Sequence, residues 1–396
     1  MNVQTMRNID RFLGIPLCWV LAGCLRILPP RRMDLRATEV RNILVVKFFG
    51  LGSILLSTGA LSMMRTCFPK ARITFLSFSS NEELLRRFPP VDEVMTLDPV
   101  RFLSFARDLL FCLRRIVQAE YDIAFDFEFF SKCSTMLCGL SRAPYRVGFA
   151  LPTRWRTLHL THNVMLPKEH HVIDAFRSQV RALCMDAELE DIVAPLLLDH
   201  DAHSLSQKIP LHEGSTVVMN VNAGETSLDR RWPASRFASL IAELASNNGY
   251  FFVLTGRESE RAYVQGVIDR TNHSHRCFNA AGLLTIPELC ALLRNCRLLI
   301  SNDSGPVHLA AALGVPTIAL FGPESPLFYG PVGNRAVNLY AGLPCSPCLN
   351  VYNAKVFHCP IGVKCLRDIS VRQVLASAEA MLNEQPRDVQ LEEVAS

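Results

Sequence analysis

Short, continuously apolar segments alternate with amphipathic stretches along the chain, and this pattern limits the fold more than any other feature. Strands that are apolar at every position are buried on both faces, which is typical of a parallel sheet covered by helices. The expected strands of the first half are Ile43–Val46, Ile73–Phe78, Asp122–Phe127 and Arg146–Phe149. Those of the second half are Thr216–Val221, Tyr250–Thr255, Arg297–Ser301 and Thr317–Phe321. The pattern predicts an α/β chain of two Rossmann-like domains whose parallel sheets face each other across a cleft.

The stretches between these strands have helical spacing. In the first half the expected helices are Ser53–Arg65, Glu82–Phe88, Arg101–Gln118, Ser131–Leu140 and Ile173–Cys184. In the second half they are Ala234–Ala245, Glu258–Ile268, Pro287–Arg294 and Val307–Leu313. The polar stretch 199–214 is expected to be a linker.

The length of 396 residues suits about two domains, at roughly 100–200 residues each. We expect an N-terminal segment over 1–40, a first domain over 41–205 and a second domain over 206–340. A Cys-rich loop and a C-terminal helix are expected over 341–396. The net charge of +4 is too small to indicate binding to nucleic acid, and we expect no such partner.

The N-terminal segment combines an apolar run with positive charge. Residues 12–25 are 14 consecutive apolar residues, fewer than the roughly 20 that a spanning helix needs. Residues 1–40 also hold six arginines against three acidic residues. An interfacial helix that contacts acidic lipid headgroups fits this composition. The alternatives are a helix packed against the protein's own core and a cleaved signal, although no small-residue cleavage site follows.

Four of the fourteen cysteines are grouped as Cys345-x2-Cys348-x10-Cys359-x5-Cys365. Four thiolates suit a structural zinc ion or an iron–sulfur cluster. The second pair lacks the usual CxxC spacing, so a reduced or disulfide-stapled loop is the alternative. The other ten cysteines lie mostly in apolar runs and are expected to be buried and reduced.

The sharpest motif is SNDSGPVH over residues 301–308, which joins an expected strand to a helix. Ser304 and Gly305 lie where the unpaired N–H groups of a helix N-terminus form a site for phosphate. His308 lies in the first turn and is a second donor to the same anion, whereas Asp303 suits a sugar hydroxyl. The alternative is an ordinary helix N-cap.

Two further loops follow strands of the second half. In NAGETSLDRRWP, over residues 222–233, a loop with Gly224 and paired arginines can clamp a diphosphate. In TGRESE, over residues 255–260, an acidic side chain can bind ribose hydroxyls. The alternative for the first loop is a solvated loop anchored by Trp232. The alternative for the second is a carboxylate at a helix start, where the helix dipole favours negative charge.

In the first half, KFFGLGS over residues 47–53 joins the first strand to its helix. The full GxGxxG fingerprint is absent because residue 55 is leucine, which disfavours a dinucleotide oxidoreductase. Asp126 and Glu128 end a strand and are expected to point toward the cleft, or to be ordinary exposed strand-end residues. His170 and His171 are expected to be solvated loop histidines.

These motifs, with YDIAFDFEFF, RVGF, TGRESERA and HLAAALGVPTIALFGPESP, resemble glycosyltransferase family 9, the ADP-heptose:lipopolysaccharide heptosyltransferases and their relatives. The resemblance runs from about Arg41 to Ile369 and implies a GT-B fold, with the acceptor on the first domain and the donor on the second. It implies inversion by direct displacement without a metal. The donor-binding residues that it implies are Arg230, Glu260, Asp303, Ser304, Gly305 and His308, and Gly224 of the loop before Arg230 is expected to join them.

One position departs from the family pattern. The first loop commonly reads Gly-Asp, with the Asp as general base, whereas this chain has Gly52-Ser53. Serine is no base of suitable pKa without help, so Asp126 or Glu128 becomes the candidate base.

The resemblance therefore implies a cytoplasmic enzyme, peripheral on the inner face of the membrane. It would transfer heptose from ADP-heptose to a lipid-linked lipopolysaccharide-core acceptor. A non-catalytic nucleotide-sugar-binding member and a nucleotide-sugar epimerase are the alternatives.

Overall fold

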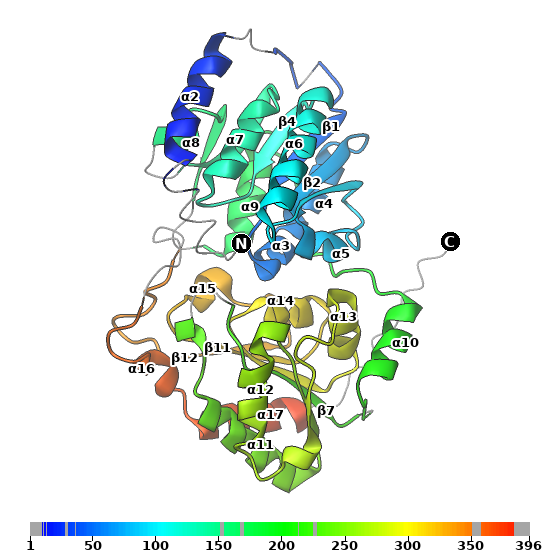
Figure 1. Ribbon diagram of the computed structural model, residues 1–396, viewed down its shortest axis with the longest axis vertical. Coiled ribbons are helices and arrows are strands. Elements are labelled where there is room, and N and C mark those ends of the chain that lie inside the picture. The colour runs from blue at the N-terminus through cyan, green and yellow to red at the C-terminus, as the bar shows by residue number, and fades with distance from the viewer. Residues whose placement is uncertain are drawn as a thin grey trace.

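The computed structural model describes residues 10, 12, 14–27, 31–35, 37–150, 154–166, 170–212, 214–224, 228–350 and 358–383. Two six-stranded sheets lie one above the other along the longest axis (Figure 1). The first has the order β3-β2-β1-β4-β5-β6 and the second β12-β11-β10-β7-β8-β9, and every neighbouring pair is parallel. The expected α/β architecture with two parallel sheets is confirmed.

The first sheet consists of β1 (Asn42–Val46), β2 (Arg72–Phe78), β3 (Glu93–Leu97), β4 (Ile123–Asp126), β5 (Tyr145–Ala150) and β6 (His162–Met165). The second consists of β7 (Thr216–Asn220), β8 (Phe251–Leu254), β9 (Cys277–Asn279), β10 (Leu298–Asn302), β11 (Thr317–Phe321) and β12 (Ala336–Tyr340). All eight strands expected from the sequence are present. The four that the apolar pattern missed, β3, β6, β9 and β12, are the four sheet edges. Each is partly exposed and lacks a continuous apolar run.

The helices around the first sheet are α2 (Gly14–Ile27), α3 (Leu51–Leu56), α4 (Thr58–Cys67), α5 (Glu82–Leu85), α6 (Phe102–Gln118), α7 (Lys132–Leu140), α8 (Arg154–Thr157) and α9 (Val172–Arg181). Those of the second half are α10 (Asp199–Lys208), α11 (Ala234–Asn248), α12 (Arg261–Ile268), α13 (Ile286–Arg294), α14 (Gly305–Ala312), α15 (Pro326–Tyr329), α16 (Lys364–Arg367) and α17 (Val371–Asn383). The single helix expected over 53–65 is instead two helices, because the chain breaks at Ser57.

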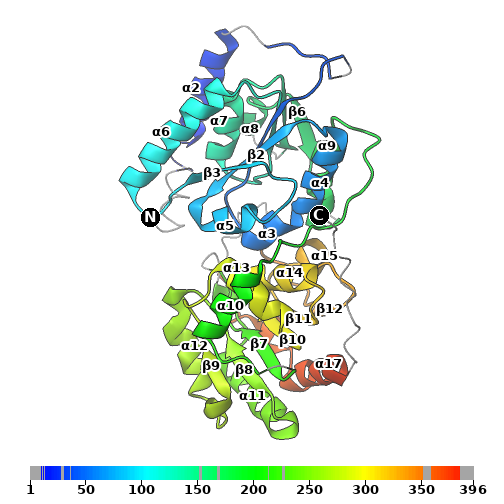
Figure 2. The ribbon, with the colours of Figure 1, turned by 90° about the vertical axis from the view of Figure 1, so that its right-hand side faces the viewer.

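The N-terminal helix α2 packs against α7 and α8 on the outside of the first domain (Figure 2). Cys18 and Ala22 are buried in this contact, and the Cys18 carbonyl oxygen lies 3.0 Å from His159 Nε2. Asp10 accepts hydrogen bonds from the backbone N–H groups of Lys132 and Cys133 at the start of α7. One face of the apolar segment therefore covers the protein's own core. Within the described residues, none of the helices is long and apolar enough to cross a membrane.

The expected linker over 199–214 is wrong for its first ten residues, which form α10. This helix packs against α13. The contact could not be recognised from the polar composition of the stretch, because charged side chains take part in it where apolar side chains would be expected. Asp201 pairs with Arg87 at 3.0 Å, and Lys208 pairs with Glu288 at 2.7 Å. The expected domain boundary between residues 205 and 206 falls inside this helix.

Glu288 is predicted to stabilise the second domain in a pH-dependent way. Burial opposes its ionisation, but hydrogen bonds from Lys208, Ser204 and the Thr285 cap outweigh burial and lower the pKa of Glu288 to about 2. Glu288→Gln should cost about 1–2 kcal/mol of unfolding free energy near neutral pH, after discounting for solvent screening.

Since the pKa of Glu288 is lower in the folded chain, its contribution is present above the ordinary value of 4.5 and fades as the pH falls toward about 2. Urea unfolding of both proteins between pH 7 and pH 2.5 measures the difference. Glu243→Gln, at an exposed position of α11, is the control. A gap between the two proteins that is independent of pH would refute this assignment.

Candidate functional site

The two loops that the sequence singled out meet at the interface between the domains. Helix α3 follows β1 of the first sheet, α14 follows β10 of the second, and the two helices pack against each other (Figure 1). A Cβ added at Gly52 would lie 2.3 Å from Cδ2 of His308, so the imidazole occupies the space that a side chain at residue 52 would need. The Leu51 side chain likewise lies 3.1 Å from the Cβ position of Gly305. The two glycines therefore permit this close approach.

The side chain of Ser304, which precedes α14, does not cap the N-terminus of that helix. The Ser304 hydroxyl accepts a hydrogen bond from Asn220 Nδ2 at 2.7 Å and donates to the Asn302 carbonyl oxygen at 3.0 Å. It makes no capping bond to the helix. The ordinary N-cap that the sequence left as an alternative is therefore not the observed arrangement. The first N–H groups of α14 stay oriented toward the domain interface, which favours an anion there.

A buried ion pair lies beside this helix N-terminus. Arg230 Nη1 is 3.1 Å from the Asp303 carboxylate and also donates to the Asp303 carbonyl oxygen at 3.3 Å. Gly224 is adjacent, since a Cβ there would lie 3.5 Å from Arg230 Nη2. Three expected donor-site residues, Gly224, Arg230 and Asp303, are thus brought together.

Glu260 lies at the start of α12 and has two roles. Its Oε2 accepts the backbone N–H of Arg257 at 2.9 Å, which is the helix-start role left as an alternative. Its Oε1 lies 3.3 Å from Arg231 Nη2, and the Arg231 guanidinium lies over the ring of Tyr263 at 4.3 Å. Arg231 therefore joins Glu260 rather than pairing with Arg230 as a two-arginine clamp.

Two buried oxygen atoms, in residues that follow strands β7 and β8, have no hydrogen-bond partner among the described residues. They are Asn222 Oδ1, just beyond β7, and Thr255 Oγ1, just beyond β8. Buried polar atoms are nearly always hydrogen-bonded, so an unsatisfied pair at the carboxyl ends of parallel strands marks a place for a polar ligand.

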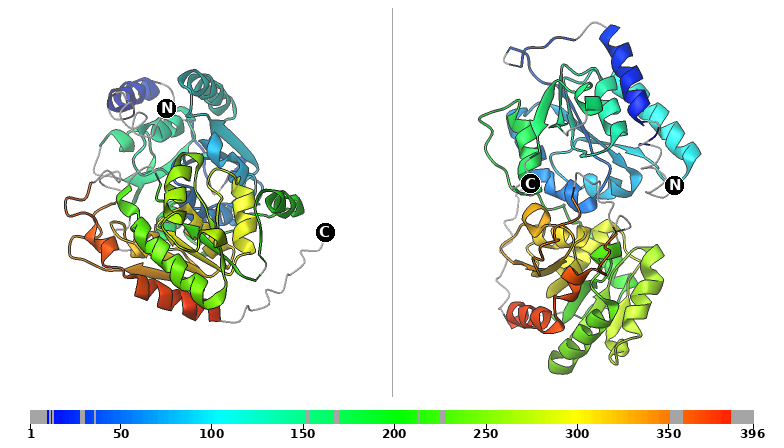
Figure 3. Two further views of the ribbon diagram at one scale, coloured as in Figure 1. Left: turned by 60° about the horizontal axis from the view of Figure 1, so that its bottom comes forward. Right: turned by 90° about the vertical axis from the view of Figure 1, so that its left-hand side faces the viewer.

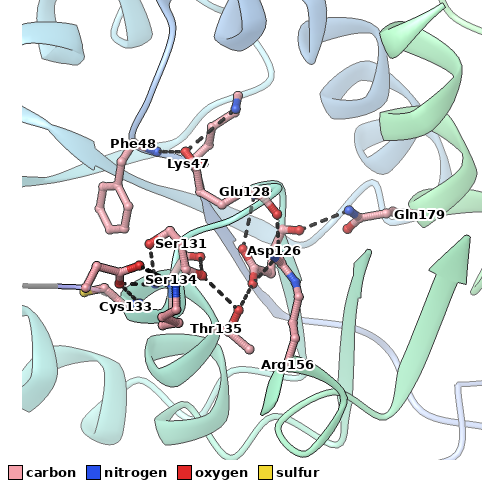
Figure 4. A network of polar contacts seen from close by, with 12 residues as sticks. Lys47, Phe48, Asp126, Glu128, Ser131, Cys133, Ser134, Thr135, Arg156 and Gln179 are labelled. Carbon is pink, nitrogen blue, oxygen red and sulfur yellow. Dashed lines mark hydrogen bonds and ion pairs between the residues drawn. The ribbon is translucent and has the colours of Figure 1, made fainter. Parts of the chain in front are cut away.

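The first domain carries a buried network of charges beneath the loop 47–53 (Figure 4). Glu128 Oε1 accepts the backbone N–H groups of Phe48 and Phe49 at 2.7 and 2.8 Å, and Lys47 Nζ lies 3.7 Å away. The Lys47 ammonium also lies 5.3 Å from the ring centre of Phe129. Glu128 therefore holds the backbone that leads into α3.

Asp126 forms the second half of this network. Its carboxylate lies 2.7 Å from Arg156 Nη2 and accepts the Thr135 hydroxyl at 2.6 Å. Arg156 also donates to the Glu128 carbonyl oxygen. Both side chains of the Asp126–Arg156 pair are completely buried.

This geometry corrects the expectation that Asp126 or Glu128 points into the interface as a general base. Burial raises the pKa of Asp126, while Arg156 and Thr135 oppose that shift, and the carboxylate has no access to an acceptor. Glu128 is 1% exposed and is occupied by two amides and an ammonium. Both carboxylates support the loop. Ser53 Oγ above them is buried and makes no hydrogen bond to any described residue.

His171 also departs from its expected role as a solvated loop histidine. It accepts the backbone N–H of Ile173 at the start of α9, and its Nε2 lies 2.8 Å from the carbonyl oxygen of Gly330 in the second domain. Burial lowers the pKa of His171. The neutral imidazole thus links the domains as a hydrogen-bond donor at Nε2.

Several positioning residues escaped the sequence analysis. Asn302 accepts the Trp232 backbone N–H and donates to the Val221 carbonyl oxygen, so it joins two of the loops. Asn220 fixes Ser304. A polar residue at the end of an apolar strand was the available signal for both asparagines, whereas no motif pointed to Arg156.

The four grouped cysteines lie close enough to influence one another. Burial raises the pKa of Cys365 to about 11, and repulsion from Cys348, Cys359 and Cys345 adds to the shift. The pKa of Cys348 is raised by burial and by two of the same thiols. Residues 351–357 of this loop lie outside the described part. Within that part, no three His, Cys, Asp or Glu side chains are arranged to hold a metal ion.

Two facing parallel sheets, with an anion-type helix N-terminus at the carboxyl end of the second, are the architecture of the GT-B fold. Residues 111–355 match the model of glycosyltransferase family 9 (heptosyltransferase), which covers more than half of the chain. The chain therefore belongs to that family.

Individual relatives agree with this assignment. Lipopolysaccharide heptosyltransferase 2 of Salmonella typhimurium is 25% identical over 358 residues, covering 87% of this chain and 99% of the relative. The solved ADP-heptose LPS heptosyltransferase II of E. coli has a TM-score of 0.69 at 21% identity, covering 86% and 98% of the two chains. An iron-containing dodecameric glycosyltransferase of enterotoxigenic E. coli has a TM-score of 0.53 at 16% identity, covering 87% and 77%.

Arg230 is predicted to bind a nucleoside diphosphate. Arg230→Ala should weaken ADP binding by about tenfold or more, because a charge-assisted contact to the diphosphate is lost. Titration calorimetry with ADP measures the change, and Arg372→Ala on α17, where the side chain is exposed, is the control. Unaltered ADP affinity in a folded Arg230→Ala protein would remove Arg230 from the donor site.

Proposed function

We propose that this glycosyltransferase moves heptose from ADP-heptose to a lipid-linked lipopolysaccharide-core acceptor. The observation that carries the proposal is the packing of α3 against α14, which brings the loop 47–53 of the first domain against the loop 301–308 of the second. The names of the Salmonella and E. coli relatives support heptose and ADP as the donor groups.

The donor-site roles follow from the local chemistry. The N–H groups of Ser304 and Gly305, with His308, bind the diphosphate at the start of α14. Arg230 adds a positive charge to the same group. In this proposal Asp303 accepts hydrogen bonds from the sugar, and Glu260 from the ribose. When the donor enters, Arg230 exchanges part of its contact with Asp303 for the diphosphate.

The transfer step is a direct displacement that inverts the anomeric carbon. The acceptor oxygen forms the new bond to that carbon as the bond to the diphosphate breaks, and the acceptor proton leaves to solvent. Stabilisation of the departing diphosphate by Arg230, His308 and α14 supplies the main reduction of the barrier. This places little demand on a base, which suits a chain with serine at residue 53.

Ser53 also favours a second candidate function, a family member that binds the nucleotide-sugar without transferring it. The presence of both Arg230 and Asp303, paired at 3.1 Å, argues for transfer, since the proposed mechanism uses Arg230 at the leaving diphosphate and Asp303 at the sugar. Turnover separates the two candidates.

Asp303 is predicted to be needed for transfer more than for nucleotide binding. Asp303→Asn should reduce heptose transfer at least about a hundredfold while ADP affinity changes by less than about threefold. Purified protein is incubated with ADP-heptose and a heptose-free core acceptor, and products are read by mass spectrometry. Asp269→Asn on the outer face of the second domain is the control.

Each outcome of that assay is decisive. Transfer that requires acceptor supports the proposal, and full activity of Asp303→Asn removes Asp303 from it. Donor that binds without turnover supports the non-catalytic alternative. A donor epimerised in the absence of acceptor would point to an epimerase.

We further propose that Cys345, Cys348, Cys359 and Cys365 hold a structural metal, either zinc or an iron–sulfur cluster. Repulsion among these thiols contributes to the raised pKa values of Cys348 and Cys365, so the four lie in one neighbourhood. In the described structure they are not arranged around one point, so the proposal requires them to close around the metal and to lose their protons when it binds. The iron named for the structural relative from enterotoxigenic E. coli supports a metal in this fold. No step of the transfer uses it.

Metal content is predicted to depend on these thiols. Protein purified under reducing, anaerobic conditions should carry stoichiometric zinc or iron by elemental analysis, and Cys345→Ser combined with Cys348→Ser should abolish it. Cys277→Ser, at a half-buried thiol far along the chain, is the control. Metal-free wild-type protein prepared in this way would contradict the proposal.

Finally, we propose that the enzyme is peripheral on the cytoplasmic face of the membrane and that α2 contacts the bilayer. The outer side of this helix exposes Ile15, Leu17, Trp19, Val20 and Ile27, and Phe12 directly before the helix is exposed as well. An apolar helix face with nearby arginines is the composition of an interfacial anchor.

A further inference from the structure

A second helix of the first domain exposes as many large apolar side chains as α2. On α6 and directly before it, the exposed large apolar side chains are Val100, Phe102, Leu103, Leu110, Phe111 and Val117. Together with the six on α2 and directly before it, these twelve side chains are here called the outer apolar surface. The other exposed large apolar side chains in the described part number nine and are scattered over both domains. Patches of this kind mark interaction sites in proteins that do not otherwise expose them.

The two helices lie on the same side of the domain. Figure 1 shows α7 between α2 and α6, the left view of Figure 3 shows α2 and α6 at the same end of the first domain, and each packs against α7. The inner side of α6 is occupied by buried Cys112 and Ile116, which contact the core. Its outer apolar side chains are therefore not needed to attach the helix to the sheet.

The charge on α6 indicates what covers this surface. Arg107 is 77% exposed, and Arg101 and Arg114 are also exposed. The single acidic residue of α6, Asp108, is paired with Arg107 at 2.9 Å. Exposed arginines among apolar side chains complement a surface that is apolar inside and negatively charged outside, which is the chemistry of an anionic bilayer.

We propose that α2 and α6 form one bilayer-binding surface, with the twelve apolar side chains among the headgroups and the α6 arginines at lipid phosphates. This inference rests on the proposed membrane contact of α2 and adds a second, independent contact. Two helices on either side of α7 fix the orientation of the domain on the membrane, which a single helix does not.

Bound through both helices, the domain would present the path by which an acceptor reaches the domain interface next to the bilayer. Helix α6 follows β3, so Val100 and Leu103 lie toward the carboxyl end of the first sheet, which is the end that carries α3. Asp10, just before α2, is bonded to the start of α7, which follows β4 at the same end. Both helices therefore begin on the side of the first sheet that faces the second domain. An acceptor sugar that leaves the bilayer there reaches the interface without passing around the domain.

Vesicle co-sedimentation of the full chain tests this surface. Wild-type protein should bind vesicles of phosphatidylethanolamine and phosphatidylglycerol, with weaker binding to phosphatidylcholine and at high salt. Leu103→Glu with Leu110→Glu on α6, and Trp19→Glu with Val20→Glu on α2, should each lower the partition coefficient by about tenfold or more. Arg107→Ala and Arg114→Ala should each lower it about fivefold.

Met185→Glu with Leu189→Glu is the matched control, because both side chains are exposed apolar residues outside the outer apolar surface. It should bind vesicles as wild type does. ADP affinity and thermal unfolding report whether each variant is folded.

The outcomes separate the inference from the proposed function. If the α2 variant loses binding and the folded α6 variant keeps it, the two-helix surface is overturned while the α2 contact stands. If wild-type protein binds no vesicles, both fail, although heptose transfer to a soluble acceptor would still stand. A wild-type dimer in sedimentation velocity that the α6 variant lacks would assign the surface to a second copy and overturn the inference.

Discussion

The arrangement of the whole site depends on charges that are buried beneath the first loop. Asp126 and Arg156 are completely buried, and removal of one partner from such a pair costs about 3–5 kcal/mol because the other is left uncompensated. Glu128 connects this pair to the backbone of Phe48 and Phe49. The loop position in turn sets where α3 begins. Helix α3 then meets α14, and no side chain larger than hydrogen fits at residue 52 beside His308.

In the second domain, internal contacts hold the residues of the proposed anion site in place when no ligand is bound. Asp303 partners Arg230 and prevents an isolated buried guanidinium. Ser304 is fixed from behind by Asn220, so its hydroxyl leaves the helix N-terminus available. Trp232 donates from its indole to the Ile369 carbonyl oxygen, which ties the donor loop to the segment before α17. Each contact holds a group of the proposed donor site in place before any ligand arrives.

Much of this was accessible from the sequence, within limits that have physical causes. Central strands such as β1, β7 and β10 are buried on both faces, and their continuous apolar runs identify them. Edge strands such as β12 are partly exposed to solvent, so they contain no continuous apolar run that would identify them. Loops at strand ends identified Asp303 and Arg230. The exposure of Asp126 and Glu128 was mispredicted because their partners, Arg156 and two backbone amides, are distant in sequence or carry no side-chain signature.

The attachment of α2 to the domain has a consequence for the reach of the enzyme. Asp10 binds the start of α7, and Cys18 and Ala22 are buried against the same domain, so the helix is a fixed part of the body. A flexible tether would let the interface sample many heights above a bilayer. In the proposed membrane-bound state, a fixed anchor would hold the domain interface at one height above the bilayer. The enzyme would then select a glycolipid whose growing end stands at that distance from the membrane, because only that end would place its hydroxyl beside α14.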